Sequence, residues 1–222
     1  MQDIEEIKIV QRAYGYYIEH AQGEEIIDLF ADGPGVYADF GNGRYLGKEG
    51  VKRYFSRPGE EIRVPGADFL HEVMMLTPVI TVNPNGITAK GRRNGFGTMA
   101  FPTGKSVTQM VFDCLYENDY VKEGGVWKIQ VMRLIGKYHC YPKDWVVPQE
   151  RSVSPSKDTG VLPGDPQPDE VVTPPPGFKR EYPTEYILPC HFNHPVTGKP
   201  TSERARNIAV YGKEIEEVYK NI

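Results

Sequence analysis

A hairpin signal near the middle of the chain constrains the fold most. Residues 106–122 and 126–138 are two runs rich in β-branched and aromatic residues, joined by Glu123, Gly124 and Gly125. Two glycines between such runs are typical of a tight hairpin turn, because glycine readily adopts the positive φ that the turn needs. Strands this long must bury one face, so the hairpin predicts a larger sheet with a cover on one side.

The rest of the first two thirds of the chain supplies that sheet and its cover. Residues 68–82 and 87–101 are two more β-rich runs, bounded by segments of Asn, Pro and Gly, and with the hairpin they predict a four-strand antiparallel meander. Apolar residues at helical spacing predict helices over 4–21, 24–31 and 48–55, with short strands at 36–40 and 44–46. The predicted fold class is α+β: a cone-shaped barrel of three N-terminal helices against a curved antiparallel sheet, whose concave side the first helix closes.

Composition excludes several classes of function. The chain has 222 residues, a net charge of −4 and no cluster of Lys and Arg, which argues against nucleic acid as a partner. No apolar run reaches the roughly 20 residues of a membrane span, and the acidic start is unlike a targeting signal, so we predict a cytoplasmic protein without a membrane partner. Neither a nucleotide-binding glycine motif nor a metal-ligand spacing occurs, so no cofactor and no metal are expected.

The composition changes after residue 141. Of the 19 prolines, 13 lie between Pro142 and Pro200, which predicts a long extended arm, and a helical pattern returns at residues 202–219. We therefore divide the chain into a domain of residues 1–145 and a proline-rich extension, residues 146–222, with a terminal helix.

Three segments carry a resemblance to a known family: residues 38–51, 77–92 and 116–129. With the order of predicted elements, they resemble the SnoaL-like branch of the nuclear-transport-factor-two-like superfamily, over about residues 4–145. The resemblance implies a deep apolar cavity, and its enzymes include isomerases, polyketide cyclases and dehydratases. The root of the arm, residues 137–145, also resembles SnoaL-like proteins of aromatic catabolism, including a lignin-derived diarylpropane lyase that releases formaldehyde without a cofactor. Association through the outer sheet face is usual in this superfamily, so we expect a homotrimer in preference to a dimer.

The resemblance implies a set of catalytic residues. Dehydratases of the superfamily have a carboxylate at the end of the first helix, where this chain has Glu19 in place of Asp, with a tyrosine nearby, here Tyr14. They also have a histidine on the first long strand, which matches His71 within two residues. In a water-poor cavity the pKa of a carboxylate such as Glu19 or Asp39 rises and that of a histidine falls, which suits proton transfer at carbon.

The predicted substrate contacts are aromatic or cationic. Arg92 or Arg133 would hold a developing phenolate or enolate, and Phe40 stands where a dehydratase of the superfamily has a tyrosine. The complete set of predicted substrate-binding residues is Tyr17, Phe40, Arg92, Asn94, Tyr116, Arg133, Tyr138 and Trp145.

The sequence leaves several alternatives open. Asp39 next to Gly41 also suits a purely structural role in a turn, and either face of residues 109–116 is compatible with lining the cavity. The functional prediction is a cofactor-independent lyase that dehydrates a small hydrophobic hydroxylated aromatic compound or releases formaldehyde from it. The alternatives are an isomerase or polyketide cyclase, and a module that binds a small molecule without chemistry.

Overall fold

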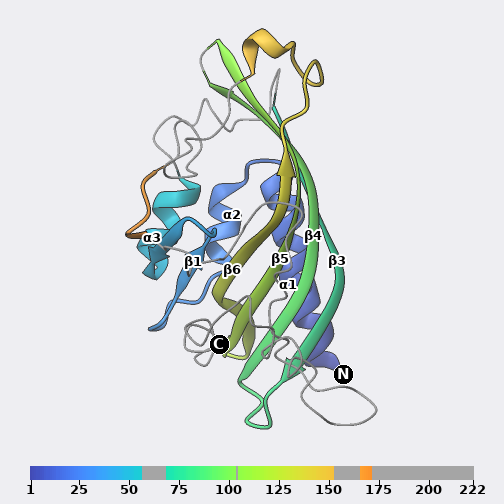
Figure 1. Ribbon diagram of the computed structural model, residues 1–222. Helices are drawn as coiled ribbons and strands as arrows, with labels where there is room; N and C mark the ends of the chain where they lie inside the picture. The colour runs from blue at the N-terminus through green and yellow to red at the C-terminus, as the bar shows by residue number, and fades with distance from the viewer. Residues whose placement is uncertain (57–68, 104, 153–165, 172–222) are drawn as a thin grey trace, which may run out of the picture. The chain divides into compact units, whose positions relative to one another are not determined.

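The computed structural model describes residues 1–56, 69–103, 105–152 and 166–171, all within one compact unit of residues 1–172. Its helices and strands occur in the following order: α1 (Gln2–Glu19), α2 (Gly23–Asp28), β1 (Tyr37–Asp39), β2 (Gly43–Leu46), α3 (Gly47–Phe55), β3 (Leu70–Val82), β4 (Thr88–Thr103), β5 (Ser106–Glu123), β6 (Val126–Cys140), a short 3-10 helix (Gln149–Arg151) and β7 (Glu170–Val171). The predicted α+β class is confirmed, with three helices beside one strongly curved sheet (Figure 1).

The sheet has seven strands in the order β3-β4-β5-β6-β1-β2-β7. The four long strands form the predicted antiparallel meander, and β3 and β7 are the two edges, so the sheet of the described residues is curved but unclosed. One pairing differs from the antiparallel prediction: β1 runs parallel to β6, with Tyr37 opposite Val131. This pairing brings the helical half of the chain to the last long strand.

The β5–β6 hairpin forms as predicted. Gly124 and Gly125 have φ values of 58° and 84°, the positive pair that a two-residue turn needs. The turn end of the hairpin also holds the start of α1, because Asp3 accepts hydrogen bonds from Lys122 (2.6 Å) and Trp127 (2.8 Å).

Helix α1 covers one face of the long strands (Figure 1). Its buried residues Ile7, Gln11, Tyr14 and Ile18 recur every three or four positions, as one face of a helix requires. Gly15 permits a close approach to β3, since a Cβ there would lie 3.3 Å from the carbonyl oxygen of Val73. The first strand of the meander is therefore held directly under the helix.

The structure settles which face of β5 is turned toward the helices. Phe112, Cys114 and Tyr116 are buried on the helix side, and Tyr14 of α1 lies against Tyr116. The rings of Phe112 and Tyr116 lie across β4, where Gly97 and Gly95 have no side chains to obstruct them. The interior under α1 is thus filled mainly by side chains of β5.

Part of the predicted arm belongs to the sheet unit. Val147 is buried, and its backbone N–H and C=O both bond the side chain of Gln109, at 2.9 Å each. Strand β7 pairs with β2, so the unit continues past the predicted boundary at residue 145. The helix predicted over residues 202–219 lies outside the described residues. Among the helices of the described part, none is long and apolar enough to cross a membrane.

Candidate functional site

A small hollow lies where the C-terminal end of α1 meets the start of β3. Its cavity volume is about 20 Å³, and it is partly open to solvent. Four elements contribute to it: the end of α1, α2 with the turn before it, the end of α3 and the start of β3. The lining residues are Ile18, Ala21, Gly23, Ile26, Phe55, Phe69 and His71.

His71 is the titratable side chain in this lining. It is 7% exposed, and its ring meets the edge of Phe101 at 5.0 Å between centroids and 89° between planes. Strand alternation places it there, because His71, Val73 and Met75 share the face of β3 that is turned toward α1. The result is an imidazole enclosed by aromatic and aliphatic walls.

The predicted carboxylate partners are not brought to His71. Glu19 is half-buried at the last position of α1, but no hydrogen bond or ion pair joins it to His71 in the described part of the chain. The reason is helical: neighbouring residues are about 100° apart around the axis, so Ile18 lines the hollow and Glu19 is turned aside. Asp39 accepts from the backbone N–H of Gly41 (2.8 Å) and pairs with Arg44 (3.3 Å), which fits the turn role.

Four of the predicted aromatic residues, Tyr14, Tyr17, Phe40 and Tyr116, belong to the core beside the hollow. Tyr14 meets both Tyr116 and Phe55 edge-on, with centroids 6.1 and 6.3 Å apart, and Phe55 also lines the hollow. Burial, and next the neighbouring Tyr14, raise the pKa of Tyr116 well above its ordinary value, so this phenol stays protonated and can donate. Tyr17 packs against the same core, and Phe40 meets Phe55 at 6.0 Å.

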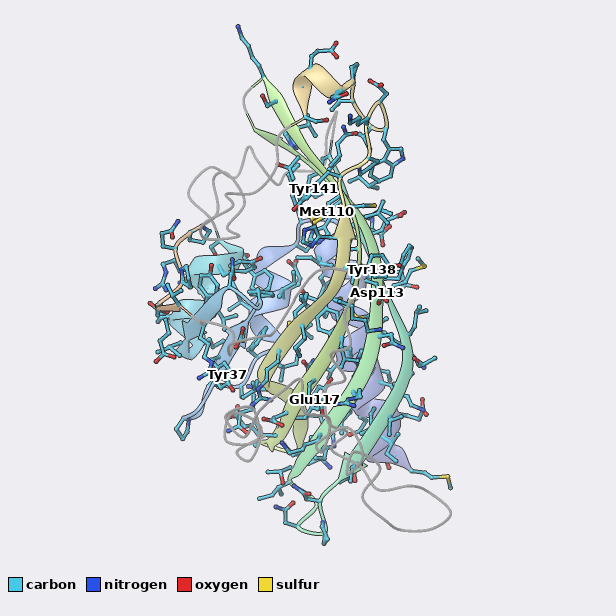
Figure 2. All side chains as sticks on the ribbon, in the orientation of Figure 1. Tyr37, Met110, Asp113, Glu117, Tyr138 and Tyr141 are labelled. Carbon is cyan, nitrogen blue, oxygen red and sulfur yellow. The ribbon has the colours of Figure 1, made fainter. Side chains whose placement is uncertain are left out.

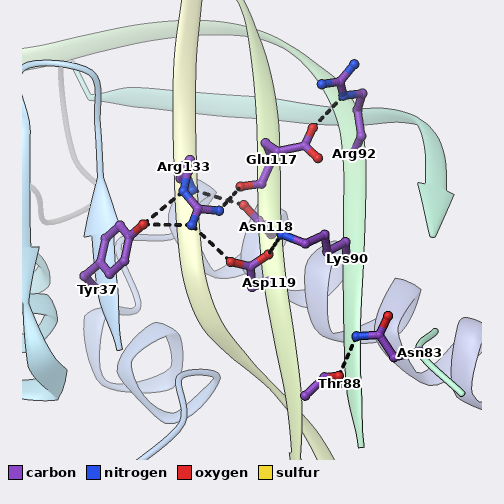
Figure 3. Close-up of polar contacts among 9 residues, drawn as sticks. All are labelled: Tyr37, Asn83, Thr88, Lys90, Arg92, Glu117, Asn118, Asp119 and Arg133. Carbon is purple, nitrogen blue, oxygen red and sulfur yellow. Dashed lines mark hydrogen bonds and ion pairs between the residues drawn. The ribbon is translucent and has the colours of Figure 1, made fainter. Parts of the chain in front are cut away.

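Arg92 and Arg133 lie on the opposite face of the sheet, away from α1 (Figure 3). Arg92 pairs with Glu117 at 2.5 Å, and Arg133 pairs with Asp119 at 3.0 Å and donates to the hydroxyl of Tyr37. The prediction was that Arg92 or Arg133 would hold a developing phenolate or enolate, but neither lines the hollow and both are paired with carboxylates. The physical reason is the two-residue period of a strand, which turns the next residue of β4 inward instead.

Three more predicted contacts also lie away from the hollow. Asn94 accepts from Lys137 (2.9 Å) and donates to Thr77 (3.3 Å) on the outer face of the long strands. Tyr138 stands opposite Asp113 in the β5–β6 register, and the two lie side by side in Figure 2. Trp145 is 41% exposed beyond the end of β6. None of these three residues lines the hollow.

The sequence reasoning missed an interior polar cluster beneath α1, formed by Gln11, Arg93, Asn118 and Tyr120, all of them buried. Gln11 accepts from the Tyr120 hydroxyl (2.8 Å) and from Asn118 (2.6 Å), and Arg93 donates to the same hydroxyl (2.8 Å). One signal was available: Gln11 falls on the apolar stripe of α1, where a polar residue needs an interior partner. Among the described residues, no group of three or more His, Cys, Asp and Glu side chains gathers as a metal site.

Comparisons with solved structures support the fold. A candidate scytalone dehydratase from Novosphingobium aromaticivorans is similar over 68% of this chain and 95% of its own, with 16% identity and a TM-score of 0.52. A hexachlorocyclohexane dehydrochlorinase (LinA), type 2, is similar over 70% and 95%, with 13% identity and a TM-score of 0.53. None of the curated proteins compared with the chain matches it in sequence. A family model, described as a SnoaL-like domain, matches residues 1–133. Because that match covers more than half of the 222 residues of the chain, the chain belongs to the SnoaL-like domain family.

Proposed function

We propose that the protein is a cofactor-independent lyase that performs an elimination on a small hydroxylated aromatic compound bound at the hollow. The observation that carries the proposal is the buried imidazole of His71 between the walls formed by Phe55, Phe69 and Phe101. An apolar aromatic lining suits a flat ring. Two of the solved structures with this fold carry the names of a dehydratase and a dehydrochlorinase, both eliminating enzymes.

In this proposal His71 takes the proton from carbon, the electron pair forms the new double bond, and the hydroxyl group leaves. The leaving hydroxyl takes up a proton and departs as water, and a neutral phenol such as Tyr14 is suited to donate to it. Glu19 is proposed to take the extra proton from the imidazolium of His71 through a bound water, since no hydrogen bond joins the two side chains among the described residues, and to pass it on to the phenolate that Tyr14 has become. Each turnover then restores the starting protonation state.

A finer form of the proposal concerns a diaryl substrate with a benzylic hydroxyl and a primary alcohol. The base removes the proton of the primary alcohol, the carbon–carbon bond breaks to release formaldehyde, and its electron pair forms the double bond as the benzylic hydroxyl leaves as water. The products are a diarylethene, formaldehyde and water, so no oxidant is consumed. The resemblance of the chain to proteins of aromatic catabolism is the support for this form.

The test compares His71→Ala with His20→Ala. His20 is a matched control because it is exposed at the end of α1, where its Nδ1 contacts the carbonyl oxygen of Tyr16 at 2.9 Å. Purified protein is incubated with hydroxylated aromatics and lignin-type dimers, and both formaldehyde and new conjugated absorbance are assayed. We expect His71→Ala to lower kcat/KM by about 100-fold or more, and His20→Ala to leave it unchanged.

Circular dichroism shows whether both variants keep the fold. Full turnover by a folded His71→Ala variant would refute the role of the imidazole. Binding of the aromatics without turnover by the wild-type protein would favour the binding module. Interconversion of isomers without loss of water or formaldehyde would favour an isomerase.

A further inference from the structure

Arg93 is a buried cation in the interior polar cluster. Its side chain is on the helix side of β4, it is 2% exposed, and its Nη2 donates to the hydroxyl of Tyr120 at 2.8 Å. Its Nε is buried and has no hydrogen-bond partner. Among the described residues, no carboxylate forms an ion pair with it.

The neighbouring arginines show how unusual this is. Arg92 and Arg133 are also buried, and each is paired with a carboxylate on the other face of the sheet, Glu117 and Asp119 respectively. Arg93 has phenols beside it instead, and the positive charge of Arg12 adds to its own. Burial lowers the pKa of Arg93, but a guanidinium loses its proton too reluctantly to become neutral at physiological pH.

A buried charge without a partner is costly, and proteins therefore pair such groups. The protein partners that could supply a negative charge are absent from the described surroundings of Arg93, whereas hydrogen-bond donors are abundant there. Tyr116 stands directly opposite Arg93 in the β4–β5 register, and burial keeps its phenol neutral. This combination of a cation and neutral phenols suits the oxygen atoms of an anion.

The strand next to Arg93 is irregular at this position. In the β3–β4 register Leu76 is opposite Asn94, and the next pair is Val79 opposite Arg92. Two residues of β3, Thr77 and Pro78, therefore correspond to the single residue Arg93 of β4. One of the two, Thr77, has a φ of 43°, a strained value for a β-branched residue. Because β3 is an edge of the sheet, the break in its ladder lies at the margin of the sheet and not between two paired strands.

We propose that Arg93 anchors a binding site for a small aromatic carboxylate in the interior of the sheet beneath α1. The guanidinium would bind the carboxylate through its Nε edge, and the rings of Tyr116 and Tyr120 would bound the aromatic part. This site is separate from the hollow: Arg93 and Met99, the partner of His71, are six residues apart on β4, or about 20 Å. The proposal does not rest on the proposed lyase activity.

The experiment compares benzoate with benzamide, a neutral molecule of nearly the same shape, on the full chain. Calorimetry measures Kd, and thermal unfolding measures Tm with and without each compound. We expect benzoate to raise Tm by about 5–10 °C at one hundred times its Kd, because a ligand that binds only the folded state stabilises it. Benzamide should produce no comparable shift.

Two substitutions at adjacent positions locate the site. Arg93→Met should abolish the benzoate shift, whereas Arg92→Met, on the opposite face, should keep it relative to its own baseline. Arg93→Lys keeps the charge without the planar fork and should weaken benzoate binding about tenfold or more, which also covers the case that Arg93→Met does not fold. An unchanged wild-type Tm with benzoate, an equal shift with benzamide, or wild-type affinity in Arg93→Lys would each overturn the proposal.

Discussion

Substitution of Gly97 by alanine tests the packing between β3, β4 and β5. Gly97 stands opposite Val73 on one side and Phe112 on the other. A Cβ added at this position would lie 2.4 Å from Cζ of Phe112 and 2.5 Å from the backbone oxygen of Glu72. The ring of Phe112 can turn away, but the backbone oxygen cannot move unless β3 moves with it.

The cost follows from that geometry. Overpacking that forces backbone shifts destabilises proteins by about 1–3 kcal/mol. For a chain of this size, each kcal/mol lowers Tm by about 2–4 °C, so we expect a Tm decrease of about 2–12 °C for Gly97→Ala. Glu72 directly follows His71, so displacement of β3 should also lower the activity proposed for the hollow.

Gly136→Ala is the matched control, because Gly136 lies in β6 with nothing within 4 Å of the added Cβ. It should leave Tm unchanged or raise it slightly, since alanine restricts the unfolded chain more than glycine does. Thermal unfolding followed by circular dichroism measures both variants under the same conditions. A Gly97→Ala protein that unfolds within 1 °C of wild type, or an equal loss in Gly136→Ala, would refute the packing argument.

Two further predictions concern titratable groups. Hydrogen bonds from Lys128 and Lys48 lower the pKa of Asp32 from 3.8 to about 2, so its contribution to stability is complete above about pH 4 and is lost as the pH falls through 2. The Tm of Asp32→Asn should therefore fall less than that of the wild type between pH 4 and pH 2. This difference should be smaller in 0.5 M NaCl, because the carboxylate is exposed and salt screens it. Parallel pH profiles of Tm for variant and wild type would contradict the prediction. Burial raises the pKa of Cys114 to about 12, whereas Cys140 is exposed. In a Cys190→Ser protein, Cys140 should therefore react with Ellman's reagent at pH 8, and Cys114 should react only in guanidinium chloride. Two reactive thiols in the native protein would show that the interior at Cys114 is open.

The fold could be predicted because its signals are local. The glycine pair at residues 124–125 predicts the hairpin because glycine adopts the positive φ values that the turn needs. The buried residues of α1 recur every three or four positions, so the buried face of this helix can be read from its own sequence. The pairing of β2 with β7 could not be predicted, since it joins Arg44 to Glu170 across most of the chain. No local pattern reports such a contact.

The site was harder to predict than the fold, because it depends on side-chain direction. Arg92 and Arg93 are chemically identical neighbours, and which of them faces α1 depends only on which alternate residues of β4 point to the helix side of the sheet. Register shifts between Asp113 and Cys114 and between Leu76 and Val79 interrupt that alternation, so counting from a distant residue gives the wrong face. A similar one-residue ambiguity on α1 separates Ile18, which lines the hollow, from Glu19.

The bare inner side of β4 has a further consequence for how such an interior can change. Where Gly95 and Gly97 leave the strand without side chains, the size of the space above it depends on single ring-bearing positions of β5, Tyr116 above all. Trimming that one ring would open volume over the backbone of β4, beside Tyr14 and Cys114. Descendants of such a sequence could therefore acquire room for bulkier guests through one substitution, while the main chain keeps its path.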